Sequence, residues 1–131
     1  MIEYKHKVHV YYRDIDQMGV VYYTRYLEYF EEARTELLRS IGISVIEIEQ
    51  MGYYLPVISC NIKYKNSAKF DEALTVNTKI TEKPRSTLKI DYEVMNSEHI
   101  LCALGETIHS FITKNGKAVK PPKEILEKME G

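Results

Sequence analysis

Two aspartates and a glycine come directly before a segment that has the apolar spacing of a helix. Asp14 and Asp16 are separated by one residue, and Gly19 follows in the same loop. The start of a helix presents backbone N–H groups that have no partner inside the helix, and it favours negative charge. A carboxylate held there could act as a nucleophile or base beside donors that polarise a substrate carbonyl. This loop is therefore the first candidate for chemistry in the chain.

The helix that would position this loop is predicted by apolar residues at helical spacing. From Tyr23 onward they recur every three or four residues, and charged residues fill the opposite side. The apolar positions are Tyr26, Leu27, Phe30, Ala33, Leu37, Leu38 and Ile41, and Gly42 ends the segment. Glu28, Glu31 and Glu32 could supply a helix-borne carboxylate, but their spacing also fits a solvated face, which we favour.

Most of the remaining chain has a period of two, which predicts an antiparallel sheet. Residues 7–13 predict a first strand, and alternating segments within 58–64, 74–80, 88–94 and 100–113 predict four more, the last of them central. Between these strands, Ser44 and Glu47 predict a short capped helix, and Pro121 and Pro122 open a terminal helix. One long helix can bury its apolar face only if the sheet curls around it. The predicted class is α+β, with a curved antiparallel sheet around one long central helix.

Composition restricts the kinds of protein that this chain could be. Its 131 residues predict a single domain, 1–131, and its formal charge of -1 gives no overall attraction to nucleic acid or to an anionic membrane. No apolar run approaches the roughly 20 residues of a membrane span, and the first residues alternate instead of forming a signal-peptide stretch. We therefore expect a cytoplasmic protein with no nucleic-acid partner and no membrane span.

The cysteines and histidines show no ligand pattern. Cys60 and Cys102 lie in alternating apolar segments outside any CxxC pair, which predicts buried, reduced thiols. The histidines lack metal-ligand spacing, so we expect neither a metal nor a cofactor. His109, on the predicted central strand, is the histidine to compare with an active-site cleft.

The segment from Asp14 to Arg34 closely resembles the signature of the 4-hydroxybenzoyl-CoA thioesterase-like branch of the hotdog-fold acyl-CoA thioesterases. The shared features are Asp-x-Asp, a spaced glycine and the pair Tyr26-Leu27. Residues 52–57 and 62–71 resemble that family's second strand and the bend after it. The resemblance covers most of the chain. It implies a hotdog fold and the hydrolysis of acyl-CoA thioesters to free acid and CoA.

The resemblance also implies roles for the residues of the loop. The family's catalytic carboxylate falls on Asp16, which would attack the thioester carbonyl or activate a water that does. The family's helix-start N–H falls on the backbone of Tyr23, and Asp14 and Gly19 would shape the loop. On spacing alone Asp16 reads better as a helix cap, whereas the long signature favours catalysis. A thiolate leaving group needs little protonation, so the lack of an adjacent general acid is no obstacle.

The same resemblance draws attention to two further places in the chain. The family binds the phosphates of CoA near the turn at 83–89, which nominates Arg85 and Ser86 as substrate-binding residues, although charges at a hairpin turn can equally be only solubilising. Tyr23 and Arg25 depart from the commoner family pattern. Arg25 could contact the substrate, a partner subunit or only solvent, and we favour solvent.

Several alternatives stay open at this level. The substrate would be an acyl-CoA or an acyl carrier protein thioester, and exposed sheet edges predict a homodimer or homotetramer. A hotdog dehydratase is disfavoured because its catalytic histidine has no counterpart, and a non-catalytic module that binds acyl groups or a protein is the main alternative. The sequence does not choose the acyl group, the number of subunits, or a nucleophile over a base role for Asp16.

Overall fold

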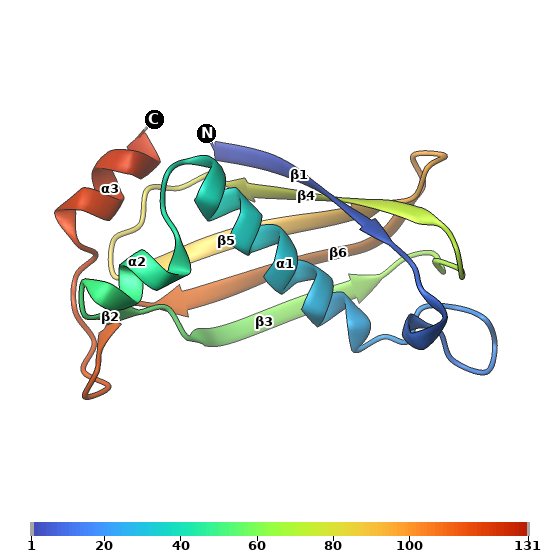
Figure 1. Cartoon of the computed structure of the whole chain (residues 1–131), viewed down its shortest axis with the longest axis horizontal. Coiled ribbons are helices and arrows are strands. Elements are labelled where there is room, and N and C mark those ends of the chain that lie inside the picture. Colours follow the sequence, from blue (N-terminus) through green and yellow to red (C-terminus); the bar gives the residue numbers. More distant parts are fainter. Residues whose placement is uncertain (1, 131) are drawn as a thin grey trace.

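The structure is a computed structural model that describes residues 2–130. A five-stranded antiparallel sheet in the order β1-β4-β5-β6-β3 curves around the long helix α1 (Figure 1). The sheet strands are β1 (Ile2–His9), β3 (Val57–Tyr64), β4 (Ala73–Ile80), β5 (Thr87–Met95) and β6 (Leu101–Ser110). The other elements are the 3₁₀ turn η1 (Tyr12–Asp14), α1 (Arg25–Ser40), α2 (Val45–Gln50), α3 (Lys123–Glu130), and the paired strands β2 (Tyr53–Tyr54) and β7 (Ile112–Thr113). The predicted α+β class is confirmed.

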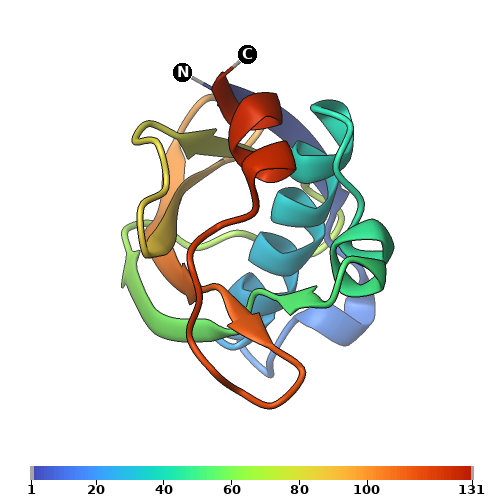
Figure 2. The same ribbon diagram turned by 90° about the vertical axis from the view of Figure 1, so that its left-hand side faces the viewer.

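Helix α1 forms where the apolar spacing predicted it, and its apolar face packs into the hollow of the sheet (Figure 2). Tyr26, Phe30, Ala33 and Leu37 are all buried on that face. Phe30 stacks on Tyr92 of β5 with ring centroids 4.2 Å apart. This contact fixes the middle of the helix over the middle of the sheet.

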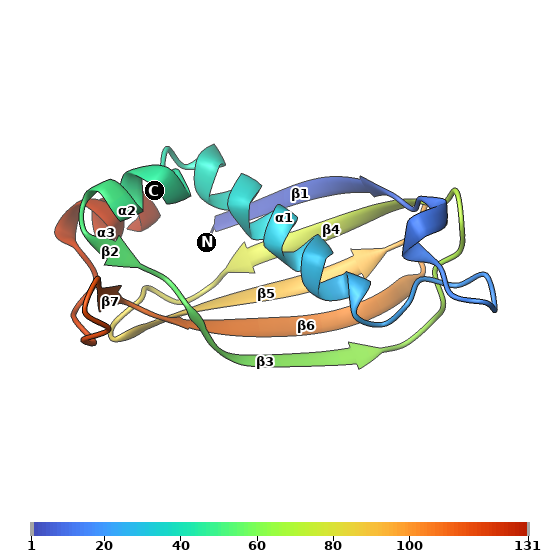
Figure 3. The same ribbon diagram turned by 60° about the horizontal axis from the view of Figure 1, so that its bottom comes forward.

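Strand β3 is the edge of the sheet that α1 leaves open (Figure 3). Its side chains are exposed along nearly the whole strand, including Val57 at 44% and Tyr64 at 49%. Val57 and Tyr64 pair with the buried residues His109 and Ala103 of β6, so they face the same side as the core. The single chain therefore leaves an apolar strip of its inner sheet face uncovered.

Some sequence predictions need correction. The first strand is Ile2–His9, not 7–13, because Asp14 folds back onto Tyr11 in a 3₁₀ turn and ends the extended chain. The segment 100–113 divides into β6 and β7; β6 lies inside the sheet between β5 and β3, and β5 is the middle strand. Cys60 is exposed because it lies on the edge strand, whereas Cys102 is buried as predicted.

Other predictions of local structure are confirmed. The Ser44 hydroxyl accepts a hydrogen bond from the backbone N–H of Glu47 at 3.0 Å, so α2 has its predicted N-cap. The terminal helix α3 follows the two prolines. Within residues 2–130, no helix has the length and apolar character needed to cross a membrane.

Candidate active site

The loop that contains the two aspartates is a narrow hairpin leading into α1. The backbone N–H of Tyr22 donates to the carbonyl of Asp14 at 2.9 Å, and the N–H of Asp16 donates to the carbonyl of Val20 at 2.9 Å. Gly19 closes the tip with a φ of 79°, and a Cβ there would meet no atom within 4 Å. Its positive φ, and not a close contact, is therefore the reason for glycine at this position.

Asp16 lies half-buried near the tip of this hairpin. Its Oδ1 accepts hydrogen bonds from the backbone N–H groups of Met18, at 2.8 Å, and Val20, at 3.4 Å. Its Oδ2 accepts none from any residue that the structure describes. One carboxylate oxygen therefore fixes the side chain, and the other is free to face a substrate.

Tyr23 follows the hairpin and precedes the first turn of α1. Its backbone N–H donates to no acceptor within residues 2–130, while its carbonyl accepts a hydrogen bond from the Tyr64 hydroxyl at 3.2 Å. The N-cap residue Thr24 makes no side-chain cap, so the positive end of a 16-residue helix stays open. The arrangement can stabilise negative charge that develops on a carbonyl oxygen.

Asp14 has a different environment from Asp16. It is buried, its Oδ2 accepts a hydrogen bond from the backbone N–H of Tyr11 at 2.9 Å, and Arg25 Nε lies 3.8 Å from its Oδ1. Burial raises the pKa of Tyr29, and the nearby charge of Asp14 adds to that rise. As predicted, Asp14 holds the loop by a hydrogen bond to its backbone.

Arg25 is not simply solvated, which corrects our interpretation of the sequence. Its guanidinium donates to both carboxylate oxygens of Glu28, at 3.0 and 2.8 Å, and to the carbonyl of Arg13 at 3.1 Å. It therefore ties the first turn of α1 to the turn that carries Asp14. The charged face of the helix is otherwise as predicted, because Glu32 is exposed and pairs with His6 at 3.1 Å.

The loop between β4 and β5, which carries Arg85 and Ser86, lies at the opposite end of the sheet from the hairpin that leads into α1 (Figure 1). The hairpin of Asp16 follows the end of the sheet where His9 pairs with Ala73, whereas the loop of Arg85 extends beyond Ile80. Eight-residue strands such as β4 span about 24 Å. One chain therefore does not bring the two predicted halves of the site together.

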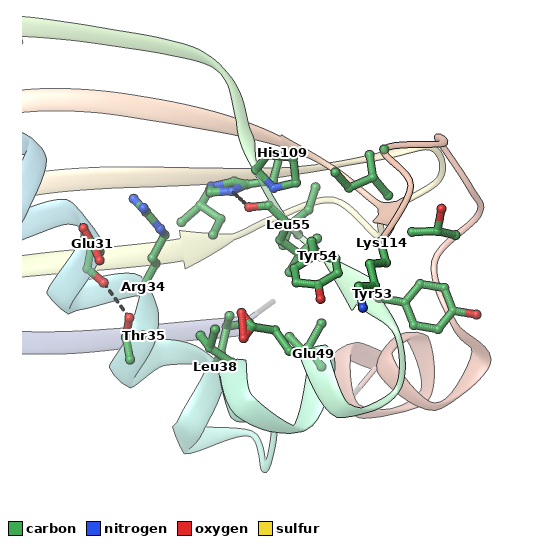
Figure 4. Close-up of a pocket in the computed structure, with 18 residues that line it drawn as sticks. Glu31, Arg34, Thr35, Leu38, Glu49, Tyr53, Tyr54, Leu55, His109 and Lys114 are labelled. Atoms are coloured by element: carbon green, nitrogen blue, oxygen red, sulfur yellow. Dashed lines mark hydrogen bonds between the residues drawn. The ribbon is translucent and has the colours of Figure 1, made fainter.

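A cavity of about 530 Å³ opens where β5 begins, which is the end of the sheet next to the loop of Arg85. Figure 4 shows the side chains that line it. It lies between the second half of α1, α2, β2 and the adjoining ends of β5 and β6. Its apolar walls include Leu38, Ile48, Leu88 and Ile90, and Arg34 and His109 bring polar groups into it. This combination of apolar walls and a few polar groups is typical of a small-molecule site.

Comparison with known proteins points to one family. A model of the thioesterase-like superfamily matches residues 10–129. The chain is 33% identical to the acyl-CoA thioesterase YbgC of Haemophilus influenzae, over 90% of this chain and 88% of that protein. The structure of DHNA-CoA thioesterase from Staphylococcus aureus matches with a TM-score of 0.90 and 27% identity, over 99% of this chain and 92% of that chain.

The chain belongs to the thioesterase-like superfamily. The structure of a 1,4-dihydroxy-2-naphthoyl-CoA thioesterase from Synechocystis is also similar, with a TM-score of 0.87 and 27% identity over 98% of each chain. The predicted family, the hotdog fold and the thioester hydrolase class are confirmed.

In this thioesterase-like protein, His109 is buried in the cavity wall and has both ring nitrogens engaged. Its Nδ1 lies 3.0 Å from the carbonyl of Leu55, and its Nε2 lies 2.9 Å from the Thr107 hydroxyl, which is 2.7 Å from the Tyr92 hydroxyl. A consistent proton arrangement has Nδ1–H donating to Leu55 and Thr107 donating to Nε2. Burial lowers the pKa of His109, and the charge of Arg34 lowers it further. His109 is therefore a neutral wall residue without a free nitrogen.

Arg34 is the cavity residue that sequence reasoning missed. It belongs to the segment that resembles the family signature, but no role was assigned to it there. The available signal was its position, four residues after Phe30 and four before Leu38, both of which are buried on the apolar face of α1. A charged residue within an apolar stripe is costly unless it has a partner, so it marks a site.

Proposed function

We propose that this protein hydrolyses acyl-CoA thioesters to a free acid and CoA, with Asp16 as the catalytic carboxylate. The observation that carries the proposal is the hairpin itself, which holds Asp16 with one free oxygen and leads to the unpartnered N–H of Tyr23 at the start of α1. The similarity to the YbgC acyl-CoA thioesterase supports an acyl-CoA substrate.

The chemistry needs a group that delivers oxygen to the thioester carbonyl and a donor for the charge that develops there. Asp16 either attacks the carbonyl carbon, which releases CoA thiolate and leaves an anhydride for water to cleave, or removes a proton from an attacking water. Both routes give the same products. The Tyr23 N–H would donate to the carbonyl oxygen, and such donors lower the activation barrier by about 3–4 kcal/mol in other hydrolases.

We also propose that the complete site forms between two copies of the chain. Strand β3 is an exposed edge, and antiparallel pairing with β3 of a second copy around a two-fold axis would place its Val57 end beside the partner's Tyr64 end. Because the Tyr64 hydroxyl contacts Tyr23, this pairing brings the catalytic hairpin of one copy toward the cavity end of the other. Arg85 and Ser86 at that end would then bind the phosphates of CoA.

The test is release of free thiol from a panel of acyl-CoA and acyl carrier protein thioesters. Asp16→Asn is expected to lower kcat by at least about a hundredfold, because it removes the charge but keeps the shape. Asp91→Asn, on β5 at the other side of the sheet, is the matched control and should keep wild-type activity. Full activity in Asp16→Asn would exclude the proposed role. Absence of turnover by the wild type on every thioester would favour a non-catalytic acyl-binding module.

A further inference from the structure

The cavity contains a cation that the proposed chemistry does not use. Arg34 is half-buried, and its side chain extends from α1 into the cavity that His109 also lines (Figure 4). Burial raises the pKa of Tyr92 and Cys60, and the positive charge of Arg34 opposes both rises. These residues and His109 lie on the neighbouring strands β5, β3 and β6. The guanidinium therefore extends from α1 toward the sheet, as Figure 4 shows.

Arg34 also differs from the other arginines of α1 in having no carboxylate partner. Arg25 pairs with Glu28 at 2.8 Å, and Arg39 pairs with Glu36 at 2.7 Å. No carboxylate oxygen of an aspartate or glutamate within residues 2–130 lies within 4.0 Å of the Arg34 guanidinium. A half-buried cation without a counterion loses hydration and gains no opposite charge in return, so it favours a ligand that supplies the missing charge.

The other charges of the cavity are placed differently. Glu31, Glu49 and Lys114 line it as well, but all three are exposed, and solvent screens them. The walls nearest the sheet are apolar and include Leu88 and Ile90. The inner part of the cavity therefore combines apolar surface with one positive charge.

A guanidinium can donate two parallel N–H···O bonds to the two oxygens of a carboxylate, which makes the pair strong and specific. We propose that the cavity selects acyl groups that carry a carboxylate of their own, and that Arg34 binds this carboxylate while the apolar walls hold the intervening carbons. The inference rests on the proposed function, because it names the substrate class of that reaction. A hydrocarbon acyl group in the same place would leave Arg34 dehydrated and without an opposite charge.

The test compares kcat/KM for pairs of thioesters of equal length, succinyl-CoA against butyryl-CoA and adipoyl-CoA against hexanoyl-CoA. The wild type is expected to prefer the carboxylated member of at least one pair by about tenfold or more, the effect of a hydrogen bond to a charged group. Arg34→Gln should lose this preference by slowing only the carboxylated substrate, and Arg34→Lys should retain part of it. Arg39→Gln, on the solvent side of the same helix, should retain all of it.

Three results would overturn the inference. One is an absence of preference in the wild type while butyryl-CoA is cleaved, which leaves the proposed function intact. Another is an equal loss on both members of each pair in Arg34→Gln, which would indicate a general role in the reaction. The third is a preference for 4-hydroxybenzoyl-CoA over benzoyl-CoA without any for the carboxylated acyl groups.

A binding measurement keeps the inference testable even if no thioester is hydrolysed. Calorimetry should show that adipate binds the wild-type protein more tightly than hexanoate does, and that Arg34→Gln removes the difference. Equal binding of the two acids to the wild type would contradict the proposal. Thermal unfolding of each variant checks that the fold is retained.

Discussion

Asp14 and Asp16 show how two residues of one type, two positions apart, take different roles. Asp14 is at the base of the hairpin, buried, and bonded to the backbone of Tyr11. Asp16 is near the tip and keeps one oxygen free of protein hydrogen bonds. Spacing alone could not separate these roles, because both residues precede a helix. The two aspartates differ because the end of β1 and the start of α1 cover Asp14 and leave Asp16 accessible.

Gly19 controls the geometry that exposes Asp16. Gly19→Ala is expected to lower the free energy of unfolding by about 1–2 kcal/mol, because a side chain disfavours a φ of 79°. It should also lower kcat about tenfold or more, since a displaced carboxylate misaligns the attack. Urea unfolding and steady-state kinetics measure the two effects.

Gly52→Ala is the matched control for this substitution. Gly52 has a φ of 90° and equally open surroundings, but it follows α2, away from the hairpin. It should therefore lose similar stability and keep kcat. A normal kcat in Gly19→Ala would show that the shape of the hairpin tip is not needed for activity.

His109 gives the protein a specific response to acid. Its native pKa lies below the ordinary 6.5 because burial disfavours the charged ring. Between pH 6.5 and the lowered pKa of native His109, the unfolded chain binds a proton that the native protein does not. Stability is therefore complete above about pH 6.5 and falls as pH decreases, by at most about 1.4 kcal/mol per pH unit from this group.

Urea unfolding at several pH values from 7.5 down to 5 tests this response. His109→Asn should show a shallower loss of stability below pH 6.5 than the wild type does. His99→Asn, which removes an exposed histidine, is the comparison variant. An unchanged slope in His109→Asn would mean that His109 is charged in the native state.

At the scale of elements, Phe30 of α1 packs closely over Gly105 of β6. A Cβ at this position would lie 2.6 Å from Phe30 Cε2 and 3.0 Å from the carbonyl oxygen of Asn61. Gly105→Ala is therefore expected to lower the free energy of unfolding by about 1–3 kcal/mol through overpacking. Phe30→Leu in the same chain should recover part of that loss.

A double-mutant cycle of Gly105→Ala and Phe30→Leu, followed by chemical denaturation, measures this coupling. The two costs should add to more than the double variant loses. Strictly additive costs would show that the ring of Phe30 is not the obstacle, and that the strain falls on the backbone of β3.

The elements differ in how well the sequence predicts them. The apolar period of α1 is long, so the helix was located to within two residues of Arg25–Ser40. Strands β2 and β7 have two residues each, too few for any period to appear, so periodicity did not indicate β2 and did not separate β7 from the predicted strand 100–113. β1 was shifted because the alternation continues past His9 into residues that the Asp14 hydrogen bond bends into a turn.

The candidate site could be predicted only where a local pattern carries it. The hairpin of Asp16 and Gly19 is continuous in the chain, so its motif was visible. The surroundings of Arg34, by contrast, are formed by strands β3, β5 and β6, which come later in the sequence. No local pattern around Arg34 indicates them. The distance between Asp16 and Arg85 depends on the directions of the strands, which no residue type encodes.

At the scale of the whole molecule, the uncovered strand β3 predicts self-association. Ile58, at a β-bulge of this edge strand, is 58% exposed. Ile58→Lys should place a charge in the proposed interface, convert the oligomer to monomers, and lower activity at least about tenfold. Sedimentation velocity and the thiol-release assay measure both outcomes.

Ile46→Lys is the comparison for this variant, because Ile46 is 68% exposed on α2. It should leave the oligomer and the activity unchanged. An Ile58→Lys protein that sediments like the wild type and remains active would show that β3 is not the contact between copies.

The separation of Asp16 from Arg85 has a genetic consequence. If each site takes its hairpin from one subunit and its CoA-binding loop from the other, then two inactive alleles, one altered at Asp16 and one at Arg85, complement each other. Every mixed dimer contains one site with both defects and one with neither. Interallelic complementation would thus restore activity to a cell that carries no intact copy of the gene.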